Sequence, residues 1–242
     1  MYRDSERPRR SCYHSMFMSR RGKFVTFEGL DGTGKSTQLR KLAAALRSAG
    51  HDVVETREPG GTASGEKIRR ILLDSKTENL ASSAEMALMF ASRAQHLAEV
   101  IEPALAEGKF VLCDRFTDST EAYQGHGRKL GSKVVLELHR LLCHGRQPDL
   151  TILLDSSPTS SLGRARRRNQ RTGHAHHGHA DENRFEQETR AFFMRVHEGF
   201  LAIARREPHR VVLVNASGTP SQTHRAIMEL VHQRLKLTAT AG

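Results

Sequence analysis

The chain has 242 residues, 37% hydrophobic and 27% charged, which suits one α/β domain with a sizeable core and excludes general disorder. Its net charge of +11 predicts an anionic partner, such as nucleic acid, an acidic membrane surface or phosphorylated small molecules. No apolar run approaches the roughly 18 residues of a membrane span. Three cysteines without a CxxC pair indicate neither a disulfide scaffold nor a Cys-based zinc site, which favours a reducing, cytoplasmic setting.

The first 21 residues show no hydrophobic periodicity and no apolar signal-peptide core. Seven basic and two acidic side chains lie in residues 1–23, so this segment is predicted to be a disordered basic tail. Residues 22–242 are predicted to form one domain.

From residue 23 onward, short apolar runs alternate with stretches of helical periodicity. The runs predict strands over 23–28, 52–56, 109–114, 149–155 and 210–215. One helix is predicted to run from the glycine-rich loop after the first strand to about residue 50. Further helices are predicted over 64–74, 81–108 and 220–236, and a helical stretch with loops follows the third strand up to residue 142. A helix, a polar insertion and a second helix fill 158–206. Strands that are apolar throughout predict a doubly wound, five-stranded parallel α/β sheet with helices on both faces.

The first strand is followed by a glycine-rich loop that matches G-x4-G-K-[ST] and opens a helix. The predicted ATP-binding residues are Gly29, Leu30, Asp31, Gly32, Thr33, Gly34, Lys35, Ser36 and Thr37. Backbone N–H groups in such a loop surround phosphate oxygens, and the helix N-terminus adds positive potential. Lys35 is expected to reach the β- and γ-phosphates and Ser36 to ligate Mg²⁺. The alternative is an unrelated strand-to-helix turn. The motif therefore predicts a P-loop NTPase fold.

Two arginines follow strands at the edge where ligands bind in an open parallel sheet. A kinase whose acceptor is itself a phosphate must hold two anions together, so it needs a second cationic site besides the phosphate loop. It needs no general base, because a phosphate monoester is already largely ionised near neutrality. Arg57 and Arg115 therefore indicate a nucleoside monophosphate kinase, the alternative for each being a surface ion pair.

Five segments, the phosphate loop among them, form a recognisable series along the chain. They are FEGLDGTGKST (27–37), TREPGGT (56–62), LMFASRAQH (88–96), DRF (114–116) with STEAYQG (119–125), and an Arg-rich segment before ENRFEQE (182–188). In order and spacing they resemble bacterial thymidylate kinase, from about Lys23 to Leu235. The resemblance implies transfer of a phosphoryl group from ATP to dTMP, with Mg²⁺, to make dTDP for DNA synthesis.

The resemblance also assigns the acceptor site. Arg57 and Arg115 correspond to the arginines that hold the dTMP phosphate, and Asp31 to the carboxylate that contacts the 3′-hydroxyl. Tyr123 matches a position beside the deoxyribose, where a ring excludes a ribose hydroxyl. Asp114 ends an apolar strand, where its carboxylate is a candidate ligand of Mg²⁺ with Ser36 or can orient Arg115; the alternative is a helix cap.

The same resemblance names the residues at the base. Phe90 corresponds to the ring that stacks on thymine, although its periodicity alone favours a core position. Arg93 corresponds to the arginine that reads the base, and Thr120 lies near it.

The lid, about residues 158–183, is predicted to be mobile. The phosphate loop lacks an arginine, whereas the lid has Arg164, Arg166 and Arg168, so the chain resembles the lid-arginine subclass. Arg168 is the best candidate for the transition-state arginine by its spacing to residues 184–186, with Arg164 and Arg166 as close alternatives. Arg168 joins Lys35, Arg115 and Asp31 in the predicted catalytic set. The His-rich stretch 169–180 departs from the family pattern and is interpreted as a solvated insertion rather than a metal site.

We therefore expect a cytoplasmic dTMP kinase that binds ATP and dTMP, forms a homodimer, and has no specific nucleic-acid or membrane partner. The nearest enzyme rival is a different nucleoside or nucleotide kinase on the same fold. A deoxynucleoside kinase would need a base to deprotonate a 5′-hydroxyl, and the arginine site at Arg57 argues against that. A nucleic-acid-binding P-loop protein is the rival from another class, motivated by the charge of +11.

Overall fold

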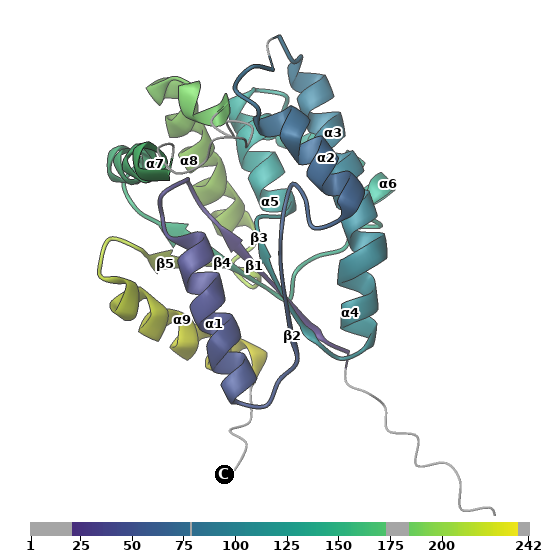
Figure 1. The fold of residues 1–242 in the computed structure, drawn as a ribbon, viewed down its shortest axis with the longest axis vertical. Helices are drawn as coiled ribbons and strands as arrows, with labels where there is room; N and C mark the ends of the chain where they lie inside the picture. Colours follow the sequence, from purple (N-terminus) through teal and green to yellow (C-terminus); the bar gives the residue numbers. More distant parts are fainter. Residues whose placement is uncertain (1–20, 78, 173–183, 237–242) are drawn as a thin grey trace, which may run out of the picture.

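In the computed structural model, five parallel strands form one sheet in the order β2-β3-β1-β4-β5 (Figure 1). The structure describes residues 21–77, 79–172 and 184–236. The strands are β1 (Lys23–Glu28), β2 (Val53–Arg57), β3 (Phe110–Asp114), β4 (Leu150–Asp155) and β5 (Val211–Asn215). Each predicted strand is confirmed to within about one residue at either end. The register sets Phe27 of β1 opposite Asp114 of β3 and Glu28 opposite Leu153 of β4, so the carboxyl ends of these strands meet at one edge.

Helices follow each of the five strands. Those before β3 are α1 (Lys35–Ser48), α2 (Ala63–Leu73), α3 (Ser82–His96), the π-helix η1 (Leu97–Ile101) and α4 (Glu102–Ala106). Between β3 and β4 lie α5 (Thr117–Thr120), the π-helix η2 (Glu121–Gly127) and α6 (Ser132–Leu142). The remainder are α7 (Pro158–Thr172), the 3-10 helix η3 (Arg184–Gln187), α8 (Arg190–Arg206) and α9 (Pro220–Leu235).

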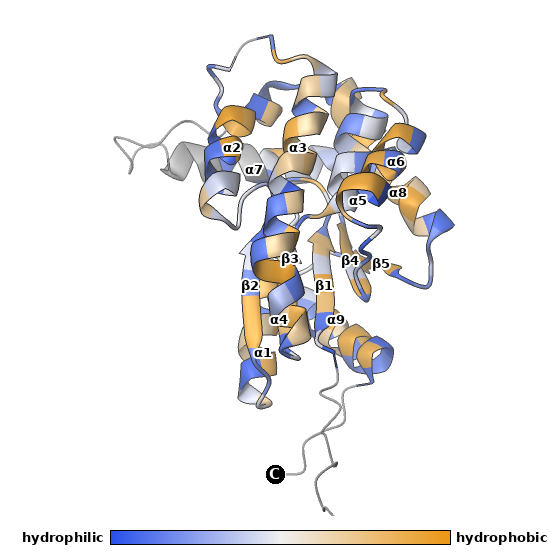
Figure 2. Ribbon diagram, turned by 90° about the vertical axis from the view of Figure 1, so that its right-hand side faces the viewer, coloured by the Kyte–Doolittle hydropathy of each residue, from blue (hydrophilic) through white to orange (hydrophobic). Residues whose placement is uncertain are grey.

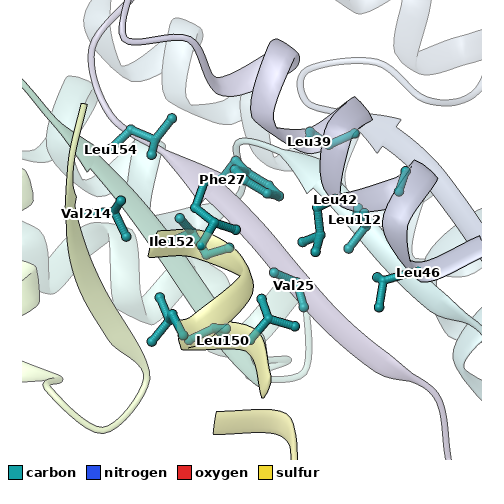
Figure 3. Packing of buried hydrophobic residues seen from close by; sticks show 14 of the residues in the cluster. Val25, Phe27, Leu39, Leu42, Leu46, Leu112, Leu150, Ile152, Leu154 and Val214 are labelled. Atoms are coloured by element: carbon teal, nitrogen blue, oxygen red, sulfur yellow. The ribbon is translucent and has the colours of Figure 1, made fainter. Parts of the chain in front are cut away.

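One face of the sheet is covered by α1 and α9 (Figure 1). Leu39, Leu42 and Leu46 of α1 pack with Val25 and Phe27 of β1 in a buried cluster (Figure 3). Burying each such leucine stabilises the fold by about 1.5–3 kcal/mol. This cluster holds the helix that begins in the phosphate loop firmly on the sheet.

The opposite face carries α3 to α4 and α8, whose apolar side chains form two further buried clusters. Phe24 of β1 lies in the first of these, so β1 is buried on both sides. Figure 2 shows hydrophobic residues along the strands and mixed hydrophobic and hydrophilic residues along the helices. This difference is the physical reason why continuous apolar runs predicted a doubly covered parallel sheet.

The helix predicted over 81–108 is interrupted in the structure. The α-helical pattern gives way to π-helical turns after His96 and resumes at Glu102, and Gly108 ends the segment with a φ of +81°. Residues 1–20 of the predicted tail and residues 173–183 of the predicted lid lie outside the described residues.

Candidate active site

The loop between β1 and α1 has the backbone geometry that its glycines require. Gly29, Gly32 and Gly34 have φ values of +129°, +82° and +96°. At Gly29 a Cβ atom would lie 2.4 Å from the carbonyl oxygen of Leu154, so only glycine fits there. Helix α1 begins directly after Gly34, and its N-terminal N–H groups face the loop as an anion-binding site.

Lys35 lies inside this loop. Its Nζ donates to the carbonyl oxygens of Gly29 at 3.1 Å and Leu30 at 3.0 Å, and lies 3.7 Å from Asp31 Oδ1. Burial and the charge of Arg115 lower the pKa of Lys35, although Asp31 opposes them. A polyanion in the loop would raise the pKa of Lys35 again and favour its ammonium form, so Lys35 is well placed to bind phosphates.

The next residue reaches across to β3. Ser36 Oγ donates to Asp114 Oδ2 at 2.6 Å, which joins the first turn of α1 to the end of β3. A hydroxyl and a carboxylate are the hard oxygen ligands that Mg²⁺ takes when its remaining positions are filled by water and phosphate. Within the described residues, this pair fits the predicted metal site.

Arg115 follows Asp114 with a φ of +72°, in the left-handed region that a non-glycine residue rarely adopts. One guanidinium nitrogen donates to Asp31 Oδ1 at 2.7 Å and the other to Ser119 Oγ at 2.8 Å. The guanidinium carbon lies 5.0 Å from the centre of the Tyr123 ring. The structure thus brings Asp31, 84 positions away in sequence, to Arg115 and to Tyr123, which follows Arg115 by eight residues. The resemblance placed all three around the acceptor. Burial raises the pKa of Tyr123, which keeps its hydroxyl protonated as a donor.

Glu28 fixes the segment that carries Arg115. One carboxylate oxygen accepts the Phe116 N–H at 2.7 Å, and the other accepts the Ser119 hydroxyl at 2.5 Å. The side chain is completely buried, and burial together with nearby Asp118 raises the pKa of Glu28 to about 8. Ser119 Oγ therefore links Glu28 to the guanidinium of Arg115.

A pocket opens between the phosphate loop and the ends of β2 and β3. It is lined by Asp31, Gly32, Gly34, Lys35, Ser36, Thr37, Arg40, Arg57, Glu58, Arg69, Asp114 and Arg115. Arg57 is half exposed there and pairs with Glu66 at 3.1 Å. Arg69 of α2 donates to the Pro59 carbonyl oxygen at 2.9 Å and adds a cation that sequence reasoning missed. The segment SGEKIRRILLD, which contains Arg69, showed only a helical pattern in the sequence. That pattern does not distinguish a pocket residue from a surface residue.

The predicted base-binding residues also come together. Arg93 is buried between the rings of Phe90 and Phe116, whose centres lie 5.0 and 5.1 Å from its guanidinium carbon. Its Nη2 donates to Thr120 Oγ1 at 2.9 Å and its Nε to Glu58 at 2.7 Å. Nη1 is buried and has no hydrogen-bond partner among the described residues, so one donor group remains for a ligand.

The first lid arginine contacts the phosphate loop. Arg164 of α7 donates from Nε to the Gly32 carbonyl oxygen at 2.8 Å and from Nη2 to Ser156 Oγ at 2.8 Å. Figure 1 shows α7 at the same end of the sheet as the β1–α1 loop. Arg168 belongs to the same helix, but its side chain and that of Arg166 lie outside the described part of the structure.

A phosphate loop and a separate arginine site at one edge of a parallel sheet define a P-loop kinase with an anionic acceptor. The thymidylate kinase family model matches residues 27–227. The chain belongs to the thymidylate kinase family and is a phosphotransferase.

The sequence of this chain matches those of curated thymidylate kinases over most of their length. The chain is 50% identical over 212 residues to the thymidylate kinase of Trichlorobacter lovleyi, covering 88% of this chain and 98% of the relative. It is 46% identical over 215 residues to that of Geobacter sulfurreducens, with coverage of 88% and 98%. A crystal structure of thymidylate kinase from Ehrlichia chaffeensis superimposes with a TM-score of 0.68 at 32% identity, covering 87% of this chain and 98% of that one.

No helix in the described ranges is both long and apolar enough to span a membrane.

Proposed function

We propose that the chain transfers the γ-phosphoryl group of ATP to dTMP in the pocket between the phosphate loop and the ends of β2 and β3. Phosphorylation of dTMP to dTDP is the reaction of the family to which the chain belongs. One observation carries the assignment of the site: Lys35 and Ser36 line the same pocket as Arg57 and Arg115. Donor and acceptor phosphates can therefore be held side by side despite their repulsion.

In the reaction, an acceptor phosphate oxygen forms a bond to the γ-phosphorus while the bond to the β,γ-bridging oxygen breaks and ADP leaves. The acceptor is already largely ionised near neutrality, so no side chain has to remove a proton. Lys35 neutralises charge on the donor phosphates, and Arg57 and Arg115 hold the acceptor phosphate. Mg²⁺, when bound, neutralises charge on the donor phosphates, with Ser36 and Asp114 as its protein ligands.

The nucleoside of dTMP is assigned to Asp31 and Tyr123, which contact Arg115, and to the residues around Arg93. Asp31 is assigned to accept a hydrogen bond from the 3′-hydroxyl and Tyr123 to limit space at the 2′ carbon; their contacts with each other and with Arg115 support this assignment. Phe90, Arg93 and Thr120 are assigned to thymine. Support comes from Arg93 Nη1, which has no hydrogen-bond partner in the part of the chain that the structure describes, and from the two rings that confine the guanidinium.

The lid arginines are assigned different roles. Arg164 holds the phosphate loop through the Gly32 carbonyl oxygen and so acts as a positioning residue. Arg168, four residues further along α7, is the proposed transition-state arginine.

The test is an ADP-release assay of the purified protein with ATP, Mg²⁺ and a panel of nucleoside monophosphates. We expect efficient use of dTMP, weaker use of dUMP and poor use of the ribose analogue of dTMP. Lys35→Ala is the matched inactive control. Equal turnover of CMP or GMP would refute the assignment of the acceptor.

We further propose a cytoplasmic homodimer. Val134, Leu138 and Leu141 recur at helical spacing on α6, and Val134 and Leu141 are exposed by 41% and 58%. Sedimentation equilibrium should give twice the chain mass, and a Leu141→Asp variant should shift the protein toward monomer.

A further inference from the structure

A buried polar network lies directly behind the arginine assigned to the base. Glu58 is 4% exposed, and both of its carboxylate oxygens are engaged. Oε2 accepts from Arg93 Nε at 2.7 Å, and Oε1 accepts from His96 Nδ1 at 2.9 Å. The other ring nitrogen of His96 lies 2.6 Å from Thr56 Oγ1. Thus Thr56, His96, Glu58 and Arg93 form one continuous chain of hydrogen bonds.

The turn after β2 is shaped around the His96 ring. A Cβ atom at Gly61 would lie 2.5 Å from His96 Nε2 and 2.8 Å from Thr56 Oγ1. The preceding Gly60 N–H donates to Ser92 Oγ of α3 at 3.1 Å. One turn of α3 thus holds residues 56–61 from inside the fold. The imidazole fits its surroundings so closely that the turn has no room for a side chain at position 61.

The network leaves one guanidinium nitrogen of Arg93 without a hydrogen-bond partner among the described residues. Its Nε and Nη2 are occupied by Glu58 and Thr120, and the rings of Phe90 and Phe116 confine its plane. Nη1 is that nitrogen, and a guanidinium nitrogen can donate but never accept. Such a group favours a carbonyl oxygen on a pyrimidine and disfavours an amino group, which would leave two donors facing each other.

Glu58, His96 and Cys113 offer ligand atoms within 4.8 Å of one another, but their bonding does not suit a metal. Both His96 nitrogens are in hydrogen bonds, and Cys113 Sγ donates to the Arg115 carbonyl oxygen at 3.0 Å. The positive charge of Arg93 already balances Glu58. Burial alone would raise the pKa of Glu58, but Arg93 and His96 outweigh it and hold that pKa below its usual range.

We infer that His96 is a positioning residue for substrate selection: by fixing Glu58 it aims Arg93 Nη1, and so sets the preference for a 4-keto over a 4-amino pyrimidine. This inference rests on the proposed role of Arg93 at the base. His96 touches neither nucleotide in this scheme. Without it, Oε1 of the buried Glu58 loses its donor, and the carboxylate is free to turn away from Arg93.

The test compares kcat/KM for dTMP with kcat/KM for dCMP in the wild-type protein and in His96 variants. His96→Leu removes both hydrogen bonds and should lower the dTMP-to-dCMP ratio at least tenfold, mainly through the KM for dTMP, while the KM for ATP stays within about twofold. The amide nitrogen of Asn occupies the place of Nδ1, so His96→Asn should keep the ratio within about threefold of wild type. His96→Gln reaches only toward Thr56 and should resemble His96→Leu.

A matched control is Val231→Ala, a buried position of α9 on the opposite face of the sheet, where stability falls but the network is untouched. Its selectivity ratio should equal that of the wild type. An unchanged ratio in folded His96→Leu would overturn the inference. If that variant does not fold, His96→Gln outperforming His96→Asn would overturn it instead. A wild-type protein that uses dCMP as well as dTMP would refute the proposed function itself, which separates the two failures.

Discussion

Replacement of Glu28 by glutamine should change how the stability of the protein depends on pH. Glu28 is completely buried, and its pKa is raised from 4.5 to about 8, first by burial and then by Asp118. Between these two values the folded protein keeps the proton on Glu28 while the unfolded chain has lost it. The stabilising contribution is therefore fully present below pH 4.5 and is lost as the pH rises toward 8. Glutamine resembles the protonated acid at every pH.

The size of the effect follows from the difference between the pKa of Glu28 in the unfolded and in the folded protein. Each pH unit between 4.5 and 8 corresponds to about 1.4 kcal/mol for a single group. From pH 5 to pH 7 the wild-type protein should thus lose about 3 kcal/mol of unfolding free energy relative to Glu28→Gln. The amide can still accept from the Phe116 N–H and can donate to Ser119 Oγ, so the local hydrogen bonds remain possible.

Urea unfolding at pH 5, 6 and 7, without nucleotide or Mg²⁺, measures this difference directly. Glu229→Gln, at an exposed position of α9, is the control and should leave the pH dependence unchanged. Parallel curves for the wild type and Glu28→Gln, within about 0.5 kcal/mol, would show that Glu28 is ionised in the folded protein and refute the reasoning.

Other predictions concern the arginines and the N-terminal segment. Arg57→Ala should raise the KM for dTMP about tenfold and also lower kcat, because the acceptor phosphate is held in both ground and transition states; an unchanged KM would argue against this. Arg168→Ala should lower kcat about 10²-fold, or about 2.7 kcal/mol, with little change in the KM for dTMP, and lysine at 168 should rescue poorly because it lacks the planar fork. Arg164→Ala should instead raise the KM for ATP severalfold, since it frees the Gly32 carbonyl oxygen; the opposite ranking of these two variants in kcat would reassign the transition-state arginine. Deletion of residues 1–21 should leave kcat and both KM values within about threefold, and loss of active protein would show that the segment belongs to the fold.

The strands and the phosphate loop could be predicted from local sequence because their causes are local. An apolar run such as FVLCD can be buried on both sides only in the middle of a covered sheet, wherever its partners come from. The glycines of the phosphate loop likewise encode backbone angles that few other residues adopt. The helix predicted over 81–108 was less well determined, since the π-helical turns after His96 leave no clear signal in hydrophobic periodicity.

The contacts that give the site its chemistry depend on strand register and helix packing, which local patterns do not encode. Ser36 meets Asp114 because β1 and β3 are neighbours, although 78 positions separate the two residues. Glu28 could be identified as a strand end, but only the packed structure shows that it holds the turn carrying Arg115. His96 gave no signal beyond its place in LMFASRAQH, since its role arises from a glutamate 38 residues earlier and a turn wrapped around its ring. Local sequence determined the elements through burial and backbone angles, whereas the partners of each buried polar group were decided by the tertiary structure, because a desolvated charge must be satisfied by whatever the fold brings next to it.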